Sequence, residues 1–382
     1  MTDGRQTPRI VFFTGGTALR ALSRVLAAQS SNVAHLVTTF DAGGSTAALR
    51  KAFAMPAVGD IRNRLLALAD TGAVPPPVMD FMNHRLPTSG SADVLRAELA
   101  NLAAGRHSLW QDMPEPFAAP LRELVNDCVS RLPQNFDPFG ANLGNMAICG
   151  GYLRHKRDFR PILAFLGQLL HVRGNVVPIV DESLHLACEL NDGRLVVGQQ
   201  HFKALPCGIR RLMLTVHAPE RATGSLADAT PCRPPLSDTA RHYIATADII
   251  CYPMGSYYSS VLANLLPRGV GEAVAANPCP KIFIPNSGAD PEIHGLSLPG
   301  QVELLLATLR ADAPDADDRH FLNTILVDTK NGRYQGEDKL EDTLRTCGAS
   351  LHDCEMVSAD NAACHRPEAT LRALLAACDV CM

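Results

Sequence analysis

The sequence opens on a short apolar run that ends in two glycines, RIVFFTGGT at residues 9–17. A run of this length rich in Ile, Val and Phe is typical of a buried strand, and the two glycines end it. Residues 18–28 then space their apolar side chains three and four apart, as on one face of a helix, and residues 33–38 predict a second strand. Strand, glycine turn, helix and strand make a βαβ opening, which predicts an α/β fold with a parallel sheet.

Further along the chain the same alternation returns after two interruptions. Residues 78–139 predict helices only, and residues 184–216 predict short strands around a turn at Asn191-Asp192-Gly193. We therefore divide the chain into a core, a helical insertion and a C-terminal extension. The core is expected at residues 1–77 and 140–330, the insertion at 78–139, and a Cys/His-rich extension at 331–382.

Composition restricts the class of protein. Of the 382 residues, 46% are hydrophobic and 19% are charged, and the formal net charge is −4, so we expect a globular protein without a nucleic-acid-binding surface. The sequence contains no uninterrupted apolar run of 18 residues and no signal peptide, so we expect no membrane partner and a cytoplasmic location. The twelve cysteines are scattered and are expected to be reduced thiols.

Several loops rich in glycine and hydroxyl side chains follow the predicted strands. Parallel strands end at one edge of the sheet, where ligands bind, and glycine lets the backbone approach a phosphate. A tight turn explains any single loop equally well, but several such loops favour a ligand site. The candidate residues in these loops are Gly15, Gly16, Thr17, Gly43, Gly44, Ser45, Gly255, Ser256, Ser260 and Asn286.

Other side chains could complete such a site. Asp41 is a candidate Mg²⁺ ligand or base, with an Asx turn as the alternative interpretation. Asp60 opens a predicted helix as an N-cap, while Arg62 and Asn63 could either face solvent or reach a phosphate. The motif Asn142-Leu143-Gly144-Asn145 could begin a helix or hydrogen-bond a ligand.

The order of these segments resembles the CofD-like superfamily, over about residues 9–295. That superfamily includes the 2-phospho-L-lactate transferases and the YvcK-type proteins that bind nucleotide sugars. The matching segments are GGT at 15–17, TTFDAGGS at 38–45, Leu49-Arg50, GDIRN at 59–63, NLGN at 142–145, ADII at 247–250 and GSYYSSVLANLL at 255–266.

The resemblance implies a Rossmann-like three-layer α/β/α core that holds a nucleoside diphosphate conjugate. It adds Arg50, Tyr258 and Asn264 to the expected binding residues, beside Asn142 and Asn145. It also implies Mg²⁺ held by Asp41, with Arg62 offsetting the charge of the leaving phosphate. Oligomeric state stays open, a homo-oligomer included.

Two departures from the family pattern bear on activity. The family carries two adjacent acids where this chain has Asp41-Ala42, and Gly-Pro-Gly where it has Pro253-Met254-Gly255. The missing acid weakens the case for a metal-assisted transfer to a deazaflavin. Two hypotheses follow: a Mg²⁺-assisted transferase that uses a nucleoside-diphosphate-linked donor, which we favour slightly, and a YvcK-type nucleotide-sugar-binding regulatory protein.

The C-terminal segment suggests a separate hypothesis. Cys378-x-x-Cys381, together with Cys354 and His352 or His365, could bind zinc. The segment contains no second closely spaced pair of ligands, so unpaired thiols on a terminal helix are the expected alternative.

Overall fold

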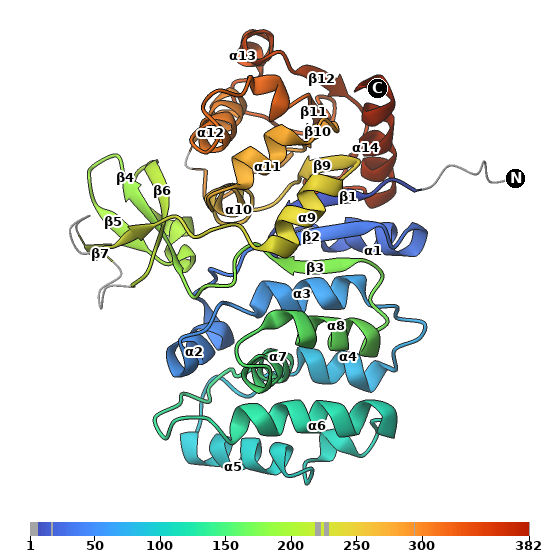
Figure 1. The fold of residues 1–382 in the computed structure, drawn as a ribbon, viewed down its shortest axis with the longest axis vertical. Coiled ribbons are helices and arrows are strands. Elements are labelled where there is room, and N and C mark those ends of the chain that lie inside the picture. Colours follow the sequence, from blue (N-terminus) through green and yellow to red (C-terminus); the bar gives the residue numbers. More distant parts are fainter. Residues whose placement is uncertain (1–6, 17, 218–222, 225–228, 294, 382) are drawn as a thin grey trace, which may run out of the picture.

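A seven-stranded parallel sheet forms the centre of the computed structural model, which describes residues 7–16, 18–217, 223–224, 229–293 and 295–381 (Figure 1). The strand order is β12-β11-β10-β9-β1-β2-β3, and each neighbouring pair runs parallel. The strands are β1 (Ile10–Thr14), β2 (Val33–Val37), β3 (Asn175–Pro178), β9 (Ile249–Tyr252), β10 (Lys281–Phe283), β11 (Thr324–Val327) and β12 (Ser350–Asp353). The predicted α/β fold is confirmed.

Helices cover both faces of the sheet, so the central strands carry apolar side chains on both sides. In β1, Phe12 packs in the apolar cluster that includes α1 (Arg20–Gln29) and α14 (Pro367–Cys381). Its neighbour Phe13 belongs to the cluster on the opposite face. The helices of that face are α9 (Asp238–Thr246), α11 (Val270–Ala276), α12 (Leu298–Arg310) and α13 (Leu340–Cys347). The C-terminal segment thus supplies both an edge strand, β12, and a covering helix, α14.

Helices stack beyond the β3 edge of the sheet, in the lower half of Figure 1. They have an apolar core of their own. Pro75-Pro76-Pro77 opens a helix here rather than ending one, since proline is favoured in a first helical turn. The helices are α2 (Gly44–Phe53), α3 (Gly59–Leu68), α4 (Pro76–Asn83), α5 (Ala92–Ala103), α6 (Glu115–Val129), α7 (Leu143–Arg154) and α8 (Phe159–Leu169).

A smaller antiparallel sheet lies to the left of the seven-stranded sheet in Figure 1. Its strands, in the order β7-β5-β4-β6-β8, are β4 (His185–Leu190), β5 (Leu195–Val197), β6 (Ile209–Thr215), β7 (Thr223–Gly224) and β8 (Pro231–Cys232). This is the predicted β-rich segment. The remaining short elements are η1 (Ser108–Trp110), η2 (Gln199–Ala204), η4 (Tyr257–Leu262), α10 (Ala263–Leu265), η5 (Asp318–His320), η6 (Glu337–Lys339), β13 (Val357–Ser358) and β14 (Asn361–His365).

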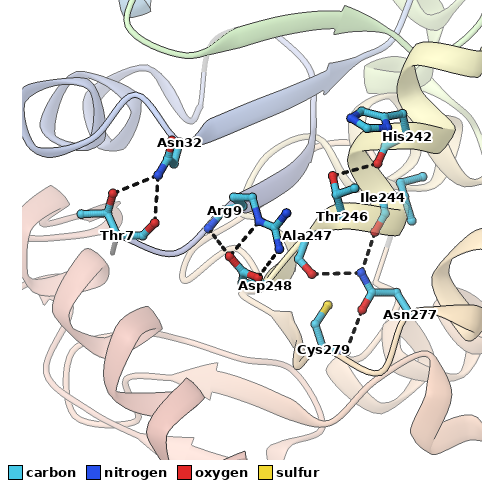
Figure 2. A network of polar contacts seen from close by, with 10 residues as sticks. All are labelled: Thr7, Arg9, Asn32, His242, Ile244, Thr246, Ala247, Asp248, Asn277 and Cys279. Carbon is cyan, nitrogen blue, oxygen red and sulfur yellow. Dashed lines mark hydrogen bonds and ion pairs between the residues drawn. The ribbon is translucent and has the colours of Figure 1, made fainter. Parts of the chain in front are cut away.

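Paired polar groups fasten the amino ends of the central strands (Figure 2). The guanidinium of Arg9 donates two hydrogen bonds to Asp248, at 3.0 and 2.7 Å. Asn277 donates to the carbonyls of Ile244 and Ala247, at 2.7 and 3.0 Å. Asp248 belongs to a segment that resembles the superfamily, yet it lies at the edge opposite the glycine loops and its partner is Arg9. Its role there is to hold β1 and β9 together.

Within the described part of the chain, no helix is long and apolar enough to cross a membrane.

Candidate functional site

A cavity of about 530 Å³ lies at the carboxyl ends of β1 and β9. Its walls come from the loop after β1, the loop after β9 and the short helix η2 of the small sheet, together with Asp41, Asp60 and Glu292. The lining residues are Thr14, Gly15, Gly16, Ala18, Leu19, Asp41, Asp60, Gln199, Gln200, Lys203, Met254, Gly255, Ser256, Ser259, Ser260 and Glu292. The carboxyl edge of a parallel sheet is where ligands bind in such folds.

A larger cavity, of about 970 Å³, follows the edge strand β3 between α8 and α9. Among its charged lining residues, Asp70 pairs with Arg173 at 2.6 Å and Arg160 pairs with Asp158 at 2.7 Å, while Asp181 and Asp238 also line it. No glycine loop predicted from the sequence reaches it. We therefore place the functional site at the smaller cavity, where predicted residues converge.

A buried arginine supports the Gly15-Gly16 loop from within the protein. Arg64 of α3 is fully buried, and its Nη2 donates to the carbonyl oxygens of Gly15 at 2.7 Å and of Gly16 at 3.3 Å. It also bonds to Thr14 Oγ1 at 2.9 Å, and its Nη1 bonds to Ser23 Oγ at 2.6 Å. With both carbonyls held by this cation, the amide groups of Gly15 and Gly16 have no hydrogen-bond partner in the described part of the chain and stay available to an anion.

Both glycines of this loop lie against side chains that leave no space for a Cβ. A Cβ on Gly16 would lie 2.2 Å from Asp60 Oδ1 and 3.0 Å from Asn63 Nδ2. A Cβ on Gly15 would lie 2.2 Å from Ser260 Oγ. Such distances are shorter than any ordinary contact, so a Cβ at either position would force the Ser260 or Asp60 side chain to shift. The same geometry brings Asp60, Asn63 and Ser260 to the loop, as the sequence predicts.

Two carboxylates, Asp41 and Asp60, face the cavity. Asp41 Oδ1 accepts hydrogen bonds from the Gly43 amide at 3.0 Å and from Gln199 Nε2 at 2.9 Å. Asp60 Oδ2 accepts one from Thr38 Oγ1 at 3.2 Å. The pKa of Asp60 is raised to about 6, first by burial and then by the negative charge of Asp41, while the Thr38 bond, Arg64 and Arg62 oppose the shift. A perturbed carboxyl in a cavity is typical of a functional site.

Carboxylates lie behind the loop after β9. Asp290 Oδ2 accepts the Tyr257 amide at 2.9 Å, and Glu292 accepts the Ser259 amide at 3.0 Å and the Ser259 hydroxyl at 2.7 Å. Burial raises the pKa of Glu292, and the hydrogen bonds from Ser259 oppose part of that shift. The Gly255 amide is held by Asn286 Oδ1 at 2.9 Å. These amides therefore already have hydrogen-bond partners within the protein. The Ser256 and Ser260 side chains of the same loop line the cavity.

Several predicted binding residues bond to the protein itself. Arg50 donates to the carbonyls of Phe40 at 3.2 Å and Asp41 at 3.0 Å, which ties the Asp41 loop to α2. Ser45 Oγ accepts the amide of Asn142 at 2.8 Å, and Asn142 caps α7. These side chains shape the loops. Gly43 and Gly44 begin α2, with Gly43 at the N-cap and Gly44 at a positive φ of 49°.

Other predicted residues lie near the cavity without lining it. Arg62 is buried, with its Nη2 bonded to Asn63 Oδ1 at 2.7 Å. Asn145 bonds to Thr46, and Asn264 donates to the carbonyl oxygen of Thr14 at 3.0 Å. The Tyr258 side chain lines a different cavity, of about 530 Å³, between β6 and α12. Thr17 lies outside the described residues.

Four polar or charged lining residues lie outside the loops that the sequence predicts. Gln199, Gln200 and Lys203 come from η2, whose place over the sheet edge depends on how the small sheet folds back. Glu292 lies in an irregular loop after β10. No local motif marks them. Arg64, which supports the glycine loop, does lie one residue after the GDIRN motif, so a buried arginine beside that motif was the available signal.

The C-terminal cysteines and histidines do not assemble a metal centre in the described residues, where no group of three or more His, Cys, Asp or Glu side chains is placed to hold an ion. Cys378 donates to the carbonyl of Leu374 at 3.0 Å, inside the α14 packing. His365 is a buried neighbour of Ser287. The side chain of Cys381 lies outside the described part.

The fold and this cavity define an α/β protein with a glycine-built polar site at the carboxyl edge of a parallel sheet. The chain belongs to the CofD family: residues 10–368 match the family described as 2-phospho-L-lactate transferase CofD. The predicted resemblance is confirmed. The match reaches through β12 and into the beginning of α14, well past the end of the segments recognised in the sequence.

Named relatives and a solved structure agree with this assignment. A Bacillus subtilis protein named gluconeogenesis factor is 30% identical over 85% of this chain and 80% of its own length. A Nostoc protein named putative gluconeogenesis factor is 25% identical over 86% of this chain and 56% of its own length. The crystal structure of protein BH3568 from Bacillus halodurans superposes with a TM-score of 0.66 at 24% identity, covering 97% of this chain and 100% of that one. That structure supports the fold.

Proposed function

We propose that this chain is a transferase that binds a nucleoside-diphosphate-linked donor and passes the distal phosphate, with the group attached to it, to a hydroxyl acceptor, with the assistance of Mg²⁺. One observation carries the proposal. Asp41 and Asp60 face the same cavity as the unpaired amides of Gly15 and Gly16. A diphosphate that carries a metal ion needs hydrogen-bond donors for its own oxygens and, beside them, anionic oxygens that can bind the metal.

The carboxylates fit Mg²⁺. This ion is commonly held by one or two carboxylates together with phosphate oxygens, and keeps several waters. Asp60 takes the place of the second acid that the Asp41-Ala42 pair lacks, since its charge and that of Asp41 interact across the cavity. Asp41 and Asp60 would hold the ion, which when bound supplies positive charge to the phosphate oxygens.

The chain's own residues then have distinct roles. The amides of Gly15 and Gly16 bind the diphosphate, with Arg64 keeping their carbonyls turned away. The acceptor oxygen attacks the distal phosphorus, the bond from that phosphorus to the bridging oxygen breaks, and nucleoside monophosphate leaves with that oxygen. The acceptor's hydroxyl proton passes to a water molecule, which acts as the base.

A second candidate is a regulatory protein that binds a nucleotide sugar without changing it. The observation that favours it is the name gluconeogenesis factor among the relatives in several bacteria. That role uses the same cavity and needs neither the base nor the metal.

A binding screen followed by a product assay separates the two candidates. Uridine and guanosine diphosphate conjugates that bind the folded chain should raise its melting temperature, and more so with Mg²⁺. The best ligand is then incubated with a deproteinised small-molecule extract as the source of acceptor. Release of nucleoside monophosphate that Asp60→Asn abolishes supports the transferase. A bound ligand recovered unchanged supports the regulatory protein, and no shift with any conjugate contradicts both.

A further inference from the structure

The proposed function leaves the cavity of about 970 Å³ beside β3 without a role. All four residues of β3 line this cavity, so it follows the whole strand, a length of about 13 Å. One wall comes from α8, which contributes Leu163 and Ala164, and the other comes from α9, which contributes Thr239 and Tyr243. In the view of Figure 1, α9 lies above β3 and α8 lies below it. The edge strand β3 is therefore the floor of a groove between two helices.

The edge of β3 that faces this groove carries backbone groups that can pair with another strand. In the described part of the chain, β3 is the last strand of its sheet and pairs only with β2. The Ile179 amide donates to the Val37 carbonyl of β2 at 3.0 Å. Alternate residues of a strand turn their N–H and C=O groups to opposite sides, so those of Val176 and Pro178 face the groove. Pro178 has no N–H and its carbonyl accepts from Ser237 Oγ at 3.0 Å, whereas Val176 offers both a donor and an acceptor.

The groove is acidic where β3 ends. Asp181 comes soon after the strand, and Asp238 follows Ser237, whose amide donates to the Ile179 carbonyl at 3.1 Å. Both carboxylates line the cavity, and neither has an ion-pair partner in the part of the chain that the structure describes. The pKa of Asp181 is raised, first by partial burial and then by neighbouring carboxylates that include Asp238, while Arg160 opposes the shift. A positive charge placed here would relieve this repulsion.

We propose that this groove binds an extended segment of a partner protein, which adds a strand to the sheet at β3 and places a Lys or Arg side chain beside Asp181 and Asp238. Hydrogen bonds to the Val176 backbone align the segment, and its alternate side chains pack against α8 and α9. A second copy of this chain does not fit as the occupant, because its own β3 is flanked by the same two helices and cannot reach the floor of the groove. The inference does not depend on the nucleotide site, which lies at the carboxyl ends of β1 and β9.

Selection of peptides from a random twelve-residue phage library against the full chain tests the groove. We expect the selected peptides to be enriched in Lys and Arg and to bind, as fluorescein-labelled synthetic peptides, in fluorescence anisotropy. Combining Asp181→Asn with Asp238→Asn changes two exposed side chains and should weaken this binding about tenfold. The matched control is Asp93→Asn, because Asp93 lies in the first turn of α5 as Asp238 does in that of α9. It should leave the affinity unchanged.

Hydrogen exchange at β3 distinguishes strand addition from other modes of binding. The Val176 amide faces the groove and the Val177 amide faces β2. A bound peptide should therefore slow exchange at Val176 about tenfold more than at Val177, measured by NMR. Peptides that bind the double variant as tightly as the wild type contradict the proposal, as do peptides that protect both amides equally. Failure to select any peptide with a Kd below about 100 μM also contradicts it.

Discussion

The two loops that face each other across the candidate site both contain glycine and hydroxyl residues. A cation lies behind one loop and carboxylates lie behind the other. The loop after β1 is backed by the cation of Arg64, which holds the carbonyls of Gly15 and Gly16. The loop after β9 is backed by Asp290 and Glu292, which hold amides of its own backbone. Glycine and hydroxyl side chains alone do not make a phosphate site. The group behind the loop decides which backbone atoms remain for a ligand.

This difference assigns unequal roles to the two loops. A cation that binds carbonyls leaves amides for an anion, and it adds positive charge behind them. Carboxylates that bind amides remove those donors and add negative charge. We therefore assign the diphosphate to the Gly15-Gly16 loop and only hydroxyl contacts to Ser256 and Ser260. Four substitutions test this contrast, in decreasing order of expected effect.

Replacing Arg64 should have the largest effect. Arg64→Met removes a buried cation that serves two carbonyls and two hydroxyls, and it removes one of the two arginine charges that lower the pKa of Asp60. Breaking such a buried arrangement costs about 3 kcal/mol of unfolding free energy, measured by urea denaturation. Arg24→Met, at an exposed site, should cost less than about 0.5 kcal/mol. Equal losses in both variants would mean that Arg64 does not hold the loop.

Gly16→Ala should remove ligand binding. The new methyl group would lie 2.2 Å from Asp60 Oδ1, so it displaces that carboxylate or fills the cavity. We expect affinity for UDP or GDP to fall about 100-fold, or about 2.7 kcal/mol. In Gly167→Ala the methyl group meets nothing within 4 Å, and binding should not change. Unchanged affinity in Gly16→Ala would place the nucleotide elsewhere.

Asp60→Asn should stabilise the protein at neutral pH while it weakens function. The folded-state pKa of Asp60 is raised to about 6, so the folded state binds more protons than the unfolded state between pH 4 and 6. Wild-type stability therefore falls as pH rises through that window, and the variant lacks this fall. The gain should be on the order of 2 kcal/mol at pH 7.5 and vanish near pH 4. Chemical denaturation at both pH values measures it, with Asp80→Asn as the exposed control. A gain that is independent of pH would refute the assigned shift.

Glu292→Gln should have the smallest effect. It removes one negative charge from the cavity wall and keeps an acceptor for Ser259. One charge across a partly hydrated cavity changes a diphosphate's affinity by a fraction of a kcal/mol, so we expect binding to tighten about threefold. Glu303→Gln, on the exposed face of α12, is the control. Weaker binding in Glu292→Gln would mean that the carboxylate helps to hold the ligand.

Local patterns were sufficient to predict the parallel sheet and the position of the glycine loops. The run before Gly15 favours a buried strand, because it is short, rich in Ile, Val and Phe, and ends in a glycine turn. Asp41, Asp60 and the Gly15-Gly16 pair follow strands directly or begin the next helix, so topology alone brings them to one edge. That part of the site depends on sequence-local features.

The rest of the site depends on tertiary packing. Gln199 reaches Asp41 because the small sheet folds back over 158 residues of sequence separation. Arg50 and Arg62 belong to motifs that suggest phosphate contacts, yet Arg50 bonds to backbone carbonyls and Arg62 bonds to the side chain of Asn63. An arginine's partner depends on where its long side chain finds acceptors, and sequence alone does not specify that.

The most direct test of the account is a crystal structure with UDP or GDP and Mg²⁺ bound. We predict that oxygens of the diphosphate accept hydrogen bonds from the amides of Gly15 and Gly16, with Asp41 and Asp60 at the metal and Arg64 still on the two carbonyls. A diphosphate held instead by the amides of the Gly255–Ser260 loop, with Gly15 and Gly16 free, would contradict the central claim.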